Sequence, residues 1–150
     1  MTTFTLSNIA EYAKKGEIYS DAPVYDESGK FRRLMCDVKF LLSNGKILII
    51  EKGFEWDENS IPFLLQPFFP KSGIYAIPAL VHDALYYLAQ GEQKFADMEF
   101  AIWMCTLRIK PKQIAFRLWA VDTFGDKWWK KNVQNPSERC LRNRNKITII

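Results

Sequence analysis

The strongest structural signal in the sequence is the stretch MCDVKFLLSNGKILII, residues 35–50. Two apolar runs, residues 35–42 and 46–50, flank Ser43-Asn44-Gly45, and both are rich in residues that favour strands. An Asn-Gly pair between such runs is typical of a β-hairpin, because both central positions of a type I′ turn need positive φ angles. The stretch therefore predicts a hairpin closed by a type I′ turn at Asn44-Gly45.

Helical patterns follow the hairpin. Pro78 suits the first turn of a helix and Gly91 suits the stop after it, while Pro111 ends one helix and begins the next. Apolar residues also recur at helical spacing through this part of the chain. We expect helices over residues 78–90, 94–109 and from 111 to 126 or beyond.

The order of these elements predicts the fold class. Strands come first and helices follow, which is typical of an α+β fold with a small antiparallel N-terminal sheet packed on about three C-terminal helices. A chain of 150 residues with 48% hydrophobic content can bury one core, so we expect a single domain. Residues 1–62 are sheet-rich, 78–132 are helical, and 133–150 form a basic tail in which residues 147–150 suit a short edge strand.

The cysteines and the apolar stretches argue against several classes of protein. Cys36, Cys105 and Cys140 are odd in number and far apart, so we expect neither a disulfide framework nor a cysteine zinc site, and a reducing compartment fits best. There is no signal-peptide pattern, and no apolar stretch approaches the roughly 20 residues that span a bilayer. We expect an intracellular protein without a transmembrane segment.

The sole histidine, His82, marks the main candidate site. His82 and Asp83 interrupt the apolar stretch 79–87, and Asp97 is equally isolated in the next helix. Because a short connection makes these helices antiparallel neighbours, Asp97 is expected to reach His82 or Tyr86. The carboxylate would orient the imidazole, so that the other ring nitrogen could activate a water. The pattern predicts a His-Asp dyad.

A cation site beside the dyad, and two alternatives to the dyad, stay open. Asp83, about 100° further round the helix, would face another side of the cleft and could hold a divalent cation, with Asp57 from the loop 56–62 as a second ligand; a zinc site with His82 is another arrangement. In the second alternative the cluster is a hydrogen-bonded part of the core, and the loop is an Asx or Ser/Thr turn without a ligand.

Positive charge gathers in the C-terminal part. Residues 108–150 carry 11 Lys and Arg against 3 Asp and Glu, within a net charge of +4 for the chain. The interface candidates are Trp128, Trp129, Lys130 and Lys131, because indole rings beside ammonium groups suit a membrane surface, a nucleic-acid backbone or a partner protein. The alternative places one tryptophan in the core and the lysines on a solvated helix face.

An ordered set of motifs resembles a family of small, uncharacterised proteins of tailed bacteriophages and prophages. The motifs are Gly-Phe-x-Trp-Asp-x-x-Ser-Ile-Pro (53–62), His-Asp-x-Leu-Tyr (82–86), Ala-Asp-x-x-Phe (96–100) and Phe124-Gly125 before Trp128. Where that family has Asp-Gly-Ala-Ser, this chain has Asp57-Glu58-Asn59-Ser60. The resemblance implies a phage origin, with the protein in the host bacterial cytoplasm or the virion.

A second, local resemblance concerns the helix pair. His82-Asp83-x-x-Tyr86 followed by Asp97 is similar to the catalytic helices of phospholipase A2, although the glycine-rich calcium loop and the disulfides of that family are missing. The resemblance implies that His82 is the general base, that Asp83 binds Ca²⁺, and that Asp97 and Tyr86 orient the histidine.

These observations leave competing interpretations of function. In the first, a phage protein hydrolyses a lipid, another ester or an envelope component at the His-Asp site, with Ca²⁺ as cofactor and membrane lipid as partner. In the second, the protein is a non-enzymatic virion or tail-associated component, or binds a host factor, and the cluster is structural. Nucleic-acid binding through the basic segment is a third interpretation.

Overall fold

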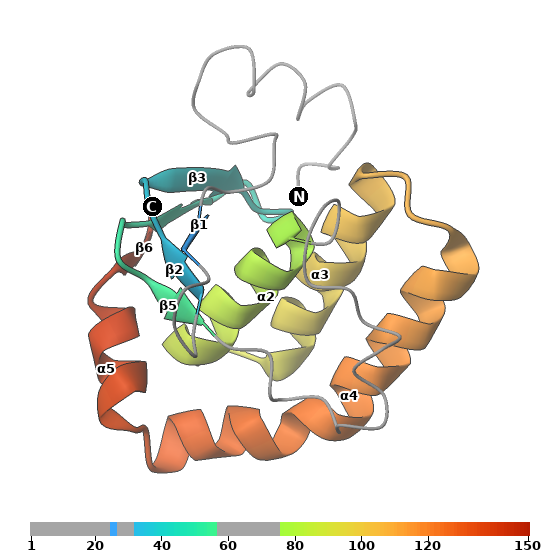
Figure 1. Cartoon of the computed structure of the whole chain (residues 1–150). Coiled ribbons are helices and arrows are strands. Elements are labelled where there is room, and N and C mark those ends of the chain that lie inside the picture. The colour runs from blue at the N-terminus through green and yellow to red at the C-terminus, as the bar shows by residue number, and fades with distance from the viewer. Residues whose placement is uncertain (1–24, 27–31, 57–75) are drawn as a thin grey trace.

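The computed structural model describes residues 25–26, 32–56 and 76–150 (Figure 1). The predicted loop 56–62 lies outside these residues from Asp57 onward. The strands are β1 (Tyr25–Asp26), β2 (Arg32–Leu34), β3 (Val38–Leu41), β4 (Ile47–Ile50), β5 (Glu55–Trp56) and β6 (Ile147–Ile149); the helices are α2 (Ala76–Leu88), α3 (Gln93–Thr106), α4 (Pro111–Gln134) and α5 (Glu138–Arg144).

The strands form two antiparallel sheets of three strands each, in the orders β1-β2-β5 and β3-β4-β6. The predicted hairpin is β3 and β4, with Val38 opposite Ile50 and Leu41 opposite Ile47. The predicted edge strand at residues 147–150 is β6, which pairs with β4 and forms one edge of the sheet β3-β4-β6.

The turn of the hairpin differs from the prediction. Within the turn, Gly45 alone has a positive φ, of 83°. The three residues 43–45 separate Leu42 from Lys46, and the Leu42 N–H donates to the Lys46 carbonyl at 2.8 Å. The Gly45 N–H donates to the Leu42 carbonyl at 3.0 Å. These features match a three-residue loop that ends in a left-handed glycine, so the predicted type I′ turn is wrong.

The helices begin and end close to the predicted limits, with one addition. α2 and α3 each start slightly earlier than expected, and α4 continues to Gln134. The predicted basic tail also contains a helix, α5, which the sequence did not indicate. Its first turn is capped by the Ser137 hydroxyl, which accepts a hydrogen bond from the Cys140 backbone N–H at 3.1 Å.

The core lies between the sheets and the helices. Figure 1 shows α2 and α3 side by side, with α4 outside α3 and then passing the ends of both helices, and with α5 beside the end of α2. Leu80, Val81 and Ala84 of α2 are fully buried, and Phe40 of β3 meets Trp103 of α3 edge to face at 5.4 Å. The arrangement confirms the α+β fold.

Two further findings bear on the classes of protein considered above. The three cysteines are free thiols, as the sequence predicted. Among the helices that the structure describes, none combines the length and the apolar character needed to cross a membrane.

Candidate functional site

The structure brings the predicted pair together. His82 of α2 and Asp97 of α3 face each other because the two helices are antiparallel neighbours, and Nε2 of His82 lies 2.9 Å from Oδ1 of Asp97. Both residues are almost completely buried, with exposed fractions of 6% and 3%. A carboxylate can only accept a hydrogen bond, so Nε2 carries the proton in this contact. The predicted contact between His82 and Asp97 is confirmed.

Tyr86 completes the cluster. It follows His82 by one helical turn, and its hydroxyl donates to the same Oδ1 of Asp97 at 2.7 Å. The His82 ring also contacts two aromatic rings, with centroid distances of 4.2 Å to Tyr86 and 4.8 Å to Phe100. The hydrogen bond to Asp97, whose position Tyr86 supports, and two ring contacts therefore fix the orientation of the imidazole.

Asp83 lies closer to the histidine than the sequence suggested. Its Oδ1 is 3.5 Å from Nδ1 of His82, so the two ring nitrogens face two different carboxylates. Asp83 and Asp97 therefore approach the imidazole at different nitrogens, and the expectation that Asp83 points to a different side of the cleft stays a prediction.

Burial and the charges of the cluster raise the pKa values of two of its residues, His82 and Tyr86. Burial alone would lower the pKa of His82, but hydrogen bonds and charge interactions with Asp83 and Asp97 outweigh it, and the pKa is raised above its usual 6.5. Burial, reinforced by the Asp97 carboxylate, strongly raises the pKa of Tyr86. The tyrosine is therefore a neutral donor, and the histidine keeps its proton to higher pH than a free imidazole does.

Helix α4 supports the cluster from outside. A Cβ atom at Gly125 would lie within 3.1 Å of Cζ of Tyr86 and closer still to the hydroxyl, so the bare backbone of the glycine makes room for the phenol. The Gln93 amide lies 3.1 Å from the same hydroxyl and, with its nitrogen turned toward Asp126, 3.2 Å from that carboxylate. Gly125 belongs to the Phe124-Gly125 motif noted in the sequence, but no sequence pattern indicated the role of Gln93.

Trp129 packs on the other side of the phenol. Its ring meets the Tyr86 ring edge to face at 5.3 Å, and only 8% of the residue is exposed. Trp129 is therefore part of the core and not an exposed interface residue, which corrects that prediction. Lys130 and Lys131 are exposed, and Trp128 is half-buried.

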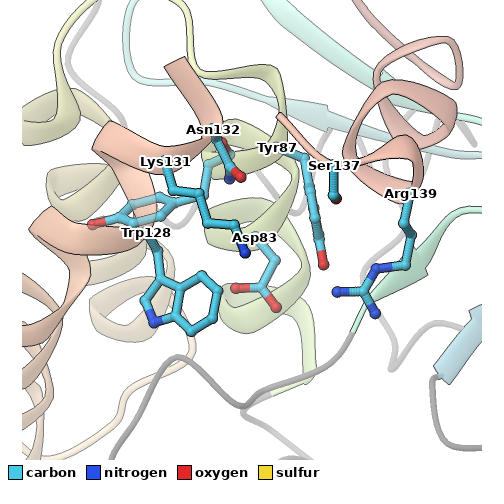
Figure 2. Close-up of a pocket in the computed structure, with 8 residues that line it drawn as sticks. Asp83, Tyr87, Trp128, Lys131, Asn132, Ser137 and Arg139 are labelled. Atoms are coloured by element: carbon cyan, nitrogen blue, oxygen red, sulfur yellow. The ribbon is translucent and has the colours of Figure 1, made fainter. Parts of the chain in front are cut away.

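A pocket borders the cluster. Figure 2 shows it between the end of α2, the end of α4 and the start of α5, with the side chains of Asp83, Lys131 and Arg139 converging on one space. The described lining residues are Asp83, Tyr86, Tyr87, Trp128, Lys131, Asn132, Ser137 and Arg139. Asp83 and Tyr86 belong to both the pocket and the histidine cluster, so the two are in direct contact.

Side chains of α4 and α5 hold the end of α2 in place at this pocket. The Tyr86 carbonyl accepts from the Asn132 amide at 2.9 Å, and the Tyr87 carbonyl accepts from Nε of Arg144 at 2.7 Å. The Cys140 thiol donates to the same Tyr87 carbonyl at 3.4 Å. These bonds satisfy carbonyls that a helix end leaves without intrahelical partners. The bonds from Arg144 and Cys140 depend on α5, a helix that the sequence did not predict.

The described residues around Asp83 do not by themselves make up a metal site. Within residues 25–26, 32–56 and 76–150, no group of three or more His, Cys, Asp or Glu side chains is placed to hold one. Lys131 and Arg139 line the same pocket as Asp83, and their charges oppose a cation there. Ca²⁺ at Asp83 stays a prediction, since the proposed second ligand, Asp57, lies outside the described residues.

A second buried carboxylate lies nearby on α3. Glu99 is fully buried, and its Oε1 accepts from the Ser43 backbone N–H at 2.8 Å and from the Ser43 hydroxyl. Its Oε2 has no hydrogen-bond partner among the residues that the structure describes. Burial raises the pKa of Glu99 although the bonds from Ser43 lower it. No sequence pattern had singled out this residue.

The fold and the cluster together define a small α+β protein with a buried His-Asp-Tyr arrangement beside a pocket. The chain belongs to the family described as "Protein of unknown function (DUF1353)", whose model matches residues 32–121. The match spans the histidine cluster but ends before Trp128, Lys131 and Arg139. No curated protein and no solved structure matches the chain.

Proposed function

We propose that this protein is a phage-encoded hydrolase that resembles phospholipase A2 in its His-Asp site and acts on an ester, either a lipid or another envelope component. One observation carries the proposal: Asp97 accepts hydrogen bonds from both Nε2 of His82 and the Tyr86 hydroxyl, at 2.9 and 2.7 Å. A base that is oriented by a carboxylate, which is itself held by a third group, is the usual arrangement for activating a nucleophile.

The roles follow from which ring nitrogen is occupied. With the proton on Nε2 held by Asp97, the basic lone pair of neutral His82 is on Nδ1, the nitrogen on the side of Asp83 and the pocket. Nδ1 would take a proton from a water while the water oxygen bonds to the ester carbonyl carbon. The same proton would then pass to the leaving oxygen as its bond to that carbon breaks.

The raised pKa of His82 sets the pH dependence of this reaction. The general base must be neutral, whereas the two carboxylates favour the imidazolium. Hydrolysis should therefore increase with pH until His82 has lost its proton, which happens above the ordinary histidine value of 6.5.

The burial of the site supports a second candidate function. His82 is 6% exposed, and each of its ring nitrogens faces a carboxylate: Nδ1 faces Asp83 and Nε2 faces Asp97. A network of this kind can specify a fold without taking part in a reaction. The protein would then be a virion or tail-associated component or a binder of a host factor.

Replacing His82 with Asn separates the two functions. Hydrolysis of p-nitrophenyl acetate and of phosphatidylglycerol vesicles is measured for the wild type, for His82→Asn and for Glu99→Gln, a matched change of a buried polar side chain on α3. Loss of a general base should lower the rate about 10²- to 10⁴-fold in His82→Asn only. Urea unfolding of the same proteins should show that His82→Asn remains folded.

Two results would contradict hydrolysis at His82. The first is an equal rate in His82→Asn and the wild type. The second is a wild type that hydrolyses neither probe, combined with a large loss of stability in His82→Asn, and this result favours the structural role. An NMR titration of the single histidine adds an independent measurement, since a ring that never titrates cannot act as a base near neutral pH.

A further inference from the structure

The basic wall of the pocket consists of one cation from each of two helices. Lys131 is on α4 and Arg139 is on α5, and Figure 2 shows both side chains directed toward the space beside Asp83. The ammonium of Lys131 lies 5.2 Å from the Trp128 ring centroid, and the guanidinium of Arg139 lies 5.8 Å from that of Tyr87. Each cation thus rests against an aromatic ring that limits where its charge can lie.

The helices that carry these cations are fixed relative to each other. Arg144 of α5 donates to the Asn132 carbonyl of α4, and its Nε bonds the Tyr87 carbonyl of α2 at 2.7 Å. The Ser137 hydroxyl accepts from the Cys140 N–H, which leaves its own O–H to donate into the pocket. The pocket therefore presents ammonium, guanidinium and hydroxyl donors on one supported frame.

The α2 side of the pocket carries the other charge. Asp83 lies on that side, with Oδ1 at 3.5 Å from Nδ1 of His82. A ligand that uses both walls needs an anionic group at the α4–α5 side and a polar, uncharged part near Asp83. A phosphate group suits the basic side well, because several equivalent oxygens can accept from Lys131, Arg139 and Ser137 at once.

We propose that the pocket binds an organic phosphate, with the phosphate held by Lys131 and Arg139 and the remainder of the molecule directed toward Asp83 and Tyr86. The inference rests on the proposed function in one respect: it makes the phosphate compound the substrate and places its ester at the His82 side. The phosphate itself is a recognition group and does not react. Lys131 and Arg139 lie beyond residues 32–121, which the family model matches.

Binding is tested with phenyl phosphate as the probe, by NMR titration of the ¹⁵N-labelled full chain. Benzoate and phenol are the carboxylate and uncharged controls. The variants Lys131→Gln and Arg139→Gln are paired with Lys130→Gln and Arg142→Gln, which remove the same charge from an exposed neighbour on the same helix and do not line the pocket. We expect affinity for phenyl phosphate to fall about tenfold or more in the first pair only.

Three results would overturn the inference. An equal loss of affinity in all four variants would show general attraction to a basic surface. Benzoate that binds as tightly as phenyl phosphate would show that the site does not select phosphate. The third is the absence of Lys131- and Arg139-dependent binding both to phenyl phosphate and to vesicles that contain phosphatidylglycerol.

The vesicle measurement identifies the source of the phosphate. Sedimentation with phosphatidylglycerol vesicles that depends on Lys131 and Arg139, without binding of phenyl phosphate, assigns the phosphate to a lipid headgroup. Binding of phenyl phosphate without sedimentation assigns it to a soluble compound.

His82→Asn distinguishes failure of this inference from failure of the proposed hydrolysis. If the variant binds phenyl phosphate like the wild type and also hydrolyses esters at the wild-type rate, the hydrolytic function fails and the pocket assignment stands. If ester hydrolysis depends on His82 but is indifferent to Lys131 and Arg139, and no phosphate binds, the function stands and the inference fails.

Discussion

Asp97 and Glu99 are two buried carboxylates on α3, two residues apart, with opposite surroundings. Residues two apart on an α-helix are separated by about 200°, so Asp97 faces α2 while Glu99 faces the β3–β4 turn. Asp97 accepts from a histidine and a tyrosine, whereas the partner of Glu99 among the described residues is Ser43. Both are almost inaccessible to solvent.

The difference shows that burial alone does not mark a reactive site. Glu99 fixes the hairpin to α3. Its hydrogen-bond partner among the described residues is Ser43, which does not take up or release a proton near neutral pH. Asp97 is bonded to His82, whose other nitrogen faces a pocket-lining carboxylate. A buried acid becomes a candidate for chemistry when its partner is titratable and connects to an opening.

The largest expected effect comes from neutralising each carboxylate in turn. Asp97→Asn replaces the acceptor that holds His82 and Tyr86, so ester hydrolysis should fall about 10²-fold or more, because the imidazole loses its orientation and the carboxylate that favours its proton on Nε2. Glu99→Gln should leave the rate within about twofold. Kinetics on folded, purified variants provide the measurement, and equal losses in both would remove the distinction between the two sites.

The sequence predicted the parts of this comparison that depend on local pattern. Asn44-Gly45 indicated the hairpin, and the short link between the two helices indicated the contact of His82 with Asp97. The turn type was wrong because Ser43 is bound by Glu99, a residue 56 positions later in the chain. A contact of that range leaves no trace in a short window of sequence.

The pocket escaped prediction for a related reason. Its basic wall depends on α5, a helix of 7 residues that is too short to be stable by its own propensity. α5 is held by tertiary contacts, such as the amide of Asn143, which bonds the backbone of Glu55 in β5, and the bond from Arg144 to Tyr87. A polar, basic segment therefore resembled a tail until its distant partners were in place.

The next largest effect tests how tightly the Asp97 side is packed. In Gly125→Ala the new methyl group would lie 3.1 Å from the Tyr86 ring and closer to its hydroxyl. The phenol or α4 must therefore shift, at a cost of about 1–3 kcal/mol in the free energy of unfolding. Urea unfolding measures this cost. Gly91→Ala is a control for crowding, because a Cβ at Gly91 meets nothing within 4 Å, although its φ of 74° adds backbone strain.

A double mutant sharpens the result. Tyr86→Phe removes the hydroxyl that Gly125 accommodates, so the cost of Gly125→Ala should be smaller in the Tyr86→Phe background than in the wild type. Additive costs would mean that the glycine is needed for another reason, such as the path of α4, and not for the position of the phenol.

The smallest expected effects are the pH dependences of stability, and they differ between the two sites. Folding raises the pKa of Glu99 and of His82, so each contributes stability that is complete below its unfolded pKa and is lost as pH rises through its folded pKa. For Glu99 the loss begins near 4.5, and for His82 it begins near 6.5. Each unit of pKa shift corresponds to about 1.4 kcal/mol.

Urea unfolding from pH 4 to pH 9 should therefore show that Glu99→Gln removes the loss of stability that begins at the lower pH, while His82→Asn removes the loss that begins at the higher pH. Identical pH profiles for the two variants would contradict the separation of the sites.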